Sequence, residues 1–215
     1  MCGRGITQLF NEANIYIGPS FIFFVLMLTL AMRAILREII TEFPRKYRYV
    51  IVAGSTLALM LTIVAHELSH YLAIRLYGMK IAKAGFYFFG AFVRPQTPVR
   101  NLPWDQLLVI SLAGPLTNIC IGAAILFFTI RLPEQSLYKN LLRVLAAINI
   151  ILGVSNLLPF AGLDGGYILM ALTQHIIGNK AVGIIIPYVI SGLCIFALLF
   201  SLIFTLSKKK KRSSF

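Results

Sequence analysis

Charged residues are scarce in this sequence. Only 13% of the 215 residues are Asp, Glu, Lys or Arg, and 59% are hydrophobic, whereas soluble domains average roughly 25% charged and about 45–50% apolar residues. The mean hydropathy is correspondingly high, at +0.85. This composition excludes an ordinary soluble domain. It predicts an integral membrane protein with several helices, because most of the chain is needed to cross the bilayer.

Cysteine is also rare, and its placement excludes two further classes of protein. The three cysteines are Cys2, Cys120 and Cys194. Their wide spacing gives neither a disulfide framework nor a cysteine zinc motif, and the last two lie in apolar runs where packing explains them. The first apolar run lacks a small-residue cleavage site after it, so we expect no cleavable signal peptide.

Acidic residues number only 7 against 20 basic ones, which gives a net charge of +13. In a soluble protein such an excess would suggest nucleic acid. Here the basic residues lie between apolar runs and in the cluster from Lys208 to Arg212. We therefore expect contact with anionic lipids and no nucleic acid.

The apolar runs predict the helices. A membrane-spanning helix needs about 20 apolar residues. The long runs extend from Ile15 to about Leu36, from Val50 to about Leu76, from about Gln106 to Ile130, from about Leu141 to Leu158, and from Ala181 to Leu206. The piece from Tyr167 to about Ile177 is too short to cross alone. We expect an all-α polytopic protein with five to six transmembrane helices, and a short interfacial β-hairpin or re-entrant loop near residues 84–95.

The basic residues give a first estimate of orientation. A lysine cluster after the last span favours a cytoplasmic C-terminus, and with six spans the N-terminus would be cytoplasmic too. The loop after the second span, which carries five basic residues from Arg75 to Arg100, would then lie inside. The first loop, with five basic residues from Arg33 to Arg48, would lie outside, against the positive-inside rule.

Three ionisable residues, His66, Glu67 and His70, lie within the second apolar run as a His-Glu-x-x-His motif. On a helix, residues four apart share a face, so the two imidazoles can hold one Zn²⁺ while Glu67 acts as a general base on water. Burying such residues in a membrane is costly, which favours a function. The alternative is a pair of packed histidines that hydrogen-bond between helices.

A catalytic zinc site on two histidines needs a third protein ligand and an open position. Six of the seven acidic residues lie near span ends, in loops or in the motif itself, which leaves Asp164 between Leu163 and Gly165. Asp164 could instead cap the helix that begins near Tyr167. The remaining histidine, His175, is expected at the membrane interface rather than at the metal.

Three motifs together resemble the site-2 protease family, the M50 intramembrane zinc metalloproteases. They are His66-Glu67-Leu68-Ser69-His70, then Ala113-Gly114-Pro115-Leu116-Thr117-Asn118, then Asn156-Leu157-Leu158-Pro159 leading to Leu163-Asp164-Gly165-Gly166. They occur in the family's order over roughly residues 50–170. The chain is most similar to the compact bacterial sporulation-type branch, here without a PDZ domain or a CBS domain. Phe160-Ala161 stands where many members have a second proline.

The resemblance implies a set of roles. His66, His70 and Asp164 would hold one Zn²⁺ per chain and Glu67 would be the catalytic base, whereas Asn156 and the stretch with Phe86, Phe88 and Gly90 would bind substrate. The substrate would be a membrane-tethered protein such as a transcription-factor precursor, cut within or next to its transmembrane segment. Regulatory membrane proteins are further expected partners.

The expected setting is a multi-pass protein of a bacterial cell membrane, with its active site toward the cytoplasm. Residues 1–207 would form one transmembrane metalloprotease domain with its core at about 50–170, and residues 208–215 a basic cytoplasmic tail. A zinc or other metal transporter, or a non-catalytic metal-binding membrane protein, is the alternative function. It is disfavoured because the other spans are almost purely apolar.

Overall fold

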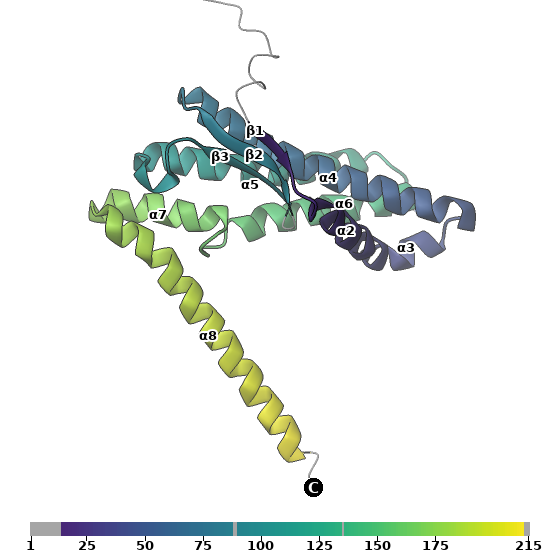
Figure 1. Cartoon of the computed structure of the whole chain (residues 1–215). Coiled ribbons are helices and arrows are strands. Elements are labelled where there is room, and N and C mark those ends of the chain that lie inside the picture. The colour runs from purple at the N-terminus through teal and green to yellow at the C-terminus, as the bar shows by residue number, and fades with distance from the viewer. Residues whose placement is uncertain (1–13, 88–89, 135, 213–215) are drawn as a thin grey trace, which may run out of the picture.

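Long helices dominate the structure, a computed structural model that describes residues 14–87, 90–134 and 136–212. The elements, in chain order, are β1 (Asn14–Ile17), α2 (Phe21–Ile35), α3 (Arg37–Thr41), α4 (Arg45–Leu76), β2 (Ile81–Tyr87), β3 (Gly90–Pro95), the 3₁₀ turn η1 (Val99–Asn101), α5 (Trp104–Thr129), α6 (Leu137–Asn156), α7 (Asp164–Ile177) and α8 (Lys180–Arg212). Among the described residues, four helices, α4, α5, α6 and α8, are long and apolar enough to cross a membrane. The predicted polytopic helical fold is confirmed (Figure 1).

The first apolar run does not form one continuous helix as expected. Residues Asn14–Ile17 form a strand, and α2 begins only at Phe21. Gly18 and Pro19 lie between them, and proline disfavours a helical conformation in the residue that precedes it. The 15 residues of α2 extend about 22 Å at about 1.5 Å per residue, less than the bilayer core of about 30 Å.

The predicted hairpin near residues 84–95 is confirmed, and it belongs to a three-stranded sheet that the sequence did not predict. β2 and β3 pair antiparallel, while β1 joins β2 in parallel. Gly85 explains the close pairing, because a Cβ at this position would collide with the backbone of Tyr16 in β1. The sheet lies alongside α4, near the end of the helix that carries the His-Glu-x-x-His motif (Figure 1).

Helix α5 is the centre of the helical bundle, because it packs against α4, α6 and α7. Gly122 and Gly153 let α5 and α6 approach closely: a Cβ on Gly153 would lie 2.7 Å from the Pro115 carbonyl oxygen. Two apolar clusters flank the motif on α4. One includes Leu59 and the other includes Tyr71, so His66 and His70 lie between them.

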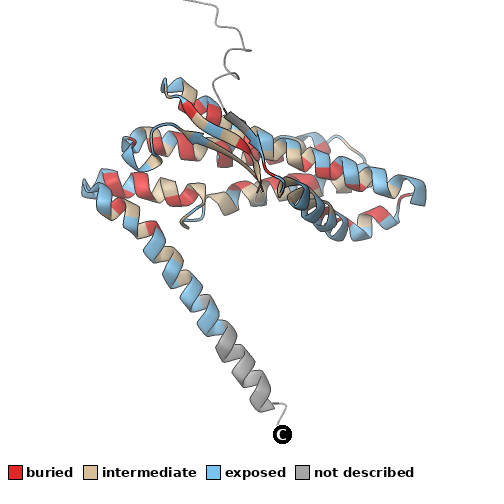
Figure 2. Ribbon diagram, viewed as in Figure 1, coloured by how far each residue is buried: buried red, intermediate tan, exposed pale blue. Residues whose placement is uncertain are grey.

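Helices α6 and α7 follow one another along α5, with a loop between them (Figure 1). α6 ends at Asn156 and α7 begins at Asp164. The far end of α7 reaches the start of α5, where the rings of His175 and Trp104 lie 4.0 Å apart. Together, α6 and α7 therefore extend along α5 as far as its first residue. Helix α8 diverges from the bundle and exposes most of its described side chains (Figures 1 and 2).

Candidate metal centre

Helix α4 brings the two motif histidines together as their spacing predicts. The Nε2 atoms of His66 and His70 lie 3.1 Å apart. Both side chains are buried, at 7% and 8% exposure. His66 lies about 15 Å from the C-terminal end of α4, at about 1.5 Å per residue, so the site is displaced toward the hairpin end of the helix.

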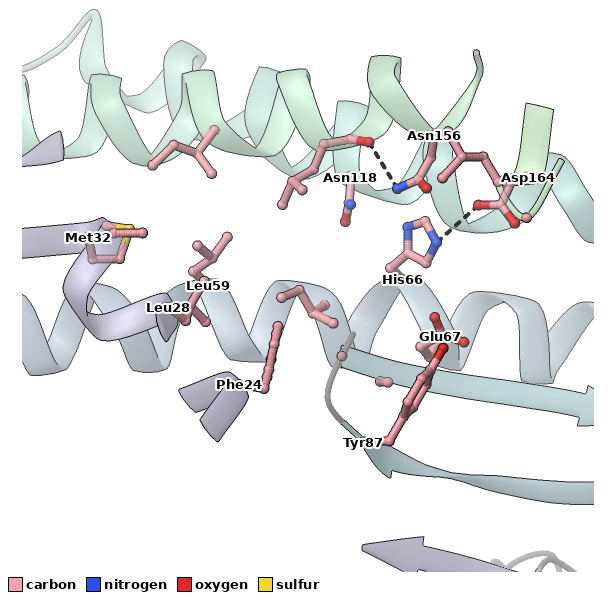
Figure 3. A pocket seen from close by; sticks show the side chains of 18 of the residues that line it. Phe24, Leu28, Met32, Leu59, His66, Glu67, Tyr87, Asn118, Asn156 and Asp164 are labelled. Carbon is pink, nitrogen blue, oxygen red and sulfur yellow. Dashed lines mark hydrogen bonds and ion pairs between the residues drawn. The ribbon is translucent and has the colours of Figure 1, made fainter. Parts of the chain in front are cut away.

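Asp164 comes to the same point from the start of α7. Its two carboxylate oxygens lie 3.2 Å from Nε2 of His66 and 3.4 Å from Nε2 of His70 (Figure 3). The ligand atoms of the three residues all lie within 4.8 Å of one another. The break between α6 and α7 thus delivers a carboxylate into the interior of the bundle, next to both imidazoles.

These three residues fit a single zinc ion. Ligand atoms about 2.0–2.2 Å from a tetrahedral ion lie roughly 3.3–3.6 Å from one another, close to the 3.1, 3.2 and 3.4 Å separations here. Two imidazoles and one carboxylate are a donor set that zinc prefers, and they leave one position open for water or substrate.

Gly114 of α5 leaves the space in which the two imidazoles meet. A Cβ on this residue would collide with Nε2 of His70 and Nε2 of His66. The carbonyl oxygen of Ile110, one turn earlier, lies 2.7 Å from Nδ1 of His70. If Nδ1 donates its hydrogen there, Nε2 keeps a free lone pair for a metal. The sequence showed Gly114 only as part of a motif, and nothing in it pointed to the Ile110 carbonyl.

A hydroxyl pair fixes α4 to α5 at the level of the site. Oγ of Ser69 and Oγ1 of Thr117 lie 2.6 Å apart, so one hydroxyl donates to the other, and the accepting hydroxyl donates to the carbonyl oxygen four residues earlier in its own helix. Ser69 lies inside the His-Glu-x-x-His motif, and Thr117 lies inside the second motif, Ala113-Gly114-Pro115-Leu116-Thr117-Asn118, called the Gly-Pro motif below. The two motifs therefore meet side by side, which the sequence order alone did not show.

Two cavities open onto the candidate ligands. A cavity of about 1030 Å³ is lined by His66, Glu67 and Asp164 and extends along apolar side chains of α2, α4 and α6. A second cavity, of about 560 Å³, also reaches Glu67 and Asp164, but its other walls include Arg94 and Tyr167. Glu67 projects into the space between the ligands and the sheet (Figure 3).

The structure brings some of the predicted substrate residues to this space. Asn156 and Gly90 line the larger cavity, and Nδ2 of Asn156 donates to the carbonyl oxygen of Leu152 at 3.0 Å. Phe86 instead contacts Phe21, with ring centroids 5.0 Å apart, and lines a small neighbouring pocket. Phe88 lies outside the described residues.

Comparisons with known proteins agree with one another. A profile of Peptidase family M50 matches residues 54–141 and 130–200. A Synechocystis sp. protein provisionally named a zinc metalloprotease is 26% identical over 174 residues, which make up 80% of this chain and 44% of that protein. A zinc metalloprotease of Methanocaldococcus jannaschii is 32% identical over 149 residues, which make up 67% of this chain and 42% of that protein.

A solved structure is also similar. The site-2 protease from Methanocaldococcus jannaschii has a TM-score of 0.59 and 25% identity, over 90% of this chain and 82% of that chain. By contrast, the chain spans less than half the length of the curated relatives it matches.

Adding one methyl group at Gly114 tests the candidate metal centre. We expect Gly114→Ala to lower the zinc content of the purified protein, because the new Cβ collides with both imidazoles. Zinc per chain, measured by atomic emission, checks this. The control is Gly192→Ala in α8, where an added Cβ meets nothing within 4 Å. Full zinc content in Gly114→Ala, with helix content unchanged, would show that the metal does not lie between these rings.

Proposed function

Because the chain belongs to peptidase family M50, we propose that it is a zinc metalloendopeptidase that cuts a membrane-tethered protein within or next to its transmembrane segment. One observation carries the proposal: two histidines and a distant carboxylate converge beside Glu67 on one cavity inside a helical bundle. A metal transporter would need further ligands along a path. Among the described residues, only this one group of three could hold an ion.

The residues divide the chemistry between them. His66, His70 and Asp164 would hold a zinc ion, which would lower the pKa of a coordinated water toward ~7 and polarise the substrate carbonyl. Glu67 accepts a proton from the attacking water. The water oxygen bonds to the carbonyl carbon, the C–N bond breaks, and Glu67 returns the proton to the leaving nitrogen.

The two cavities suggest separate routes for substrate and water. The larger cavity, with its long apolar wall, suits a substrate segment that comes from the lipid phase. The smaller cavity has an arginine and a tyrosine in its walls and suits water. Both reach Glu67, so the water and the peptide bond would meet at this carboxylate.

The substrate must be unwound before it is cut, because a helix keeps its carbonyls in hydrogen bonds. The sheet order is β1-β2-β3, so β3 is an edge strand among the described residues and could accept an extended substrate segment as an added strand. Gly90 begins β3 at the wall of the larger cavity, and Asn156 lies on the same wall. We assign both to substrate binding, together with Phe86 and Phe88 of the same hairpin.

Substrate identity and partners stay predictions. A transcription-factor precursor, regulatory membrane proteins and anionic lipids are each compatible with a compact, basic membrane protease. Co-expression with candidate tethered proteins, scored for cleavage with and without a zinc chelator, tests the substrate.

The active site is proposed to face the cytoplasm, because cleavage near that face would release a tethered transcription factor where it acts. The cytoplasmic tail at residues 208–215 stays a prediction as well. Five crossings would put the hairpin and the C-terminal end of α8 on opposite sides of the membrane, and six crossings would put them on the same side. With a cytoplasmic active site, the arginines near α3 lie outside, against the positive-inside rule, so orientation needs a direct test.

Cysteine labelling provides that test. In a cysteine-free background, we expect Lys83→Cys in the hairpin to react with a membrane-impermeant maleimide only after cells are permeabilised. Glu38→Cys in α3 should react in intact cells. Both positions are exposed. The reverse pattern would place the active site toward the outside.

Replacing the proposed base tests the mechanism. We expect Glu67→Gln to keep wild-type zinc content and to lower cleavage of a co-expressed substrate by at least ~10²-fold, since the amide cannot accept the proton. The matched control is Glu38→Gln on the exposed surface of α3, which should cleave normally. Wild-type cleavage by Glu67→Gln would exclude this mechanism.

Asn156→Leu tests substrate binding in the same assay. This variant should retain zinc and cleave more slowly, because it binds the substrate less well.

A further inference from the structure

Asn118 is a polar side chain of the Gly-Pro motif that has no role in the mechanism above. It belongs to α5, is only 2% exposed, and lines the larger cavity with His66. Its Oδ1 atom is buried and has no hydrogen-bond partner among the described residues. Leaving such an oxygen unpaired is unfavourable, so a buried orphan of this kind requires a physical reason.

His66 likewise has a buried ring nitrogen without a hydrogen-bond partner among the described residues. This nitrogen is Nδ1, whereas Nδ1 of His70 has the Ile110 carbonyl oxygen at 2.7 Å. Histidines that bind a metal almost always donate their other ring N–H to an oxygen, which fixes the tautomer and the ring orientation. One ring of the pair is held in this way and the other is not.

The helix geometry places Asn118 on the correct side of His66. Ile110 lies beside His70, and Gly114 lies against both rings, so α4 and α5 run antiparallel and Asn118 lies one turn beyond Gly114. Side chains lean toward the N-terminus of their own helix, which carries the His66 ring toward that turn. In Figure 3 Asn118 projects beside His66, on the side of the ring away from Asp164.

We propose that Asn118 is a positioning residue for His66. Its Oδ1 accepts the hydrogen of His66 Nδ1, directly or through one bridging water, and this leaves Nε2 unprotonated and turned toward the metal. The inference rests on the proposed function, because it takes His66 as a zinc ligand. It also gives the Gly-Pro motif a purpose: Gly114 leaves room for the rings, and Asn118 orients the ring that Ile110 does not reach.

Zinc affinity measures this role without any peptidase assay. The full chain in detergent micelles is titrated against a chromogenic chelator. We expect Asn118→Leu to bind zinc about 10–100-fold more weakly than wild type, the usual cost of losing an oxygen that orients a ligand. Asn118→Asp keeps the accepting oxygen and should bind close to wild type. The visible absorption of the cobalt-substituted protein should change in Asn118→Leu and return in Asn118→Asp.

Asn149 provides a matched control. It is buried in α6 at 1% exposure, and its Oδ1 also lacks a partner among the described residues, but it does not line the larger cavity with the candidate ligands. Asn149→Leu should therefore leave zinc affinity unchanged. If Asn118→Leu does not fold, the smaller replacement Asn118→Ala takes its place.

Three results would overturn the inference. The first is wild-type zinc affinity in Asn118→Leu, and the second is an equal loss of zinc affinity in Asn118→Leu and Asn118→Asp. The third is a loss of zinc affinity in Asn156→Leu but not in Asn118→Leu. Wild-type protein that binds no zinc would instead contradict the proposed function itself, so the two failures can be told apart.

Discussion

The approach of one carboxylate to two imidazoles inside the bundle is the constraint on which the rest of the structure depends. Asp164 lies 3.2 Å from His66 and 3.4 Å from His70, although about a hundred residues separate it from them in the chain. Ionisable groups are expensive in a membrane interior unless they pair or bind a metal. The site therefore accounts for the packing of α4 and α7 against α5 at this level.

Two departures from regular helix follow from this constraint. The first departure is the loop between α6 and α7. It ends the first helix at Asn156 and lets Asp164 begin a new helix beside the histidines. β3, an edge strand of the sheet among the described residues, begins at Gly90, which lines the larger cavity together with His66. Irregular backbone is tolerated in a membrane where protein or a water-filled cavity satisfies it, and both cavities lie here.

Much of this arrangement could be predicted from the sequence. Hydropathy located the long helices, the spacing of His66 and His70 put both on one face, and the scarcity of acids singled out Asp164. Strand β1 was missed because residues 15–17 belong to the first apolar run, and the pairing of the strand through Gly85 has no local signal. The contacts of Gly114 and Ile110 were missed because helix–helix register is a tertiary property. Phe86 packs against Phe21, and its role in substrate binding stays a prediction.

The central claim is that His66, His70 and Asp164 together bind one zinc ion. X-ray absorption at the zinc edge of the purified protein tests it most directly. The account predicts two imidazole nitrogens at about 2.0–2.1 Å and carboxylate or water oxygens at about 2.0–2.2 Å, with no sulfur. The Asp164→Ala variant should bind zinc more weakly, and the zinc that it does bind should still show imidazole scattering. A sulfur ligand at about 2.3 Å, or a spectrum without imidazole scattering, would contradict it.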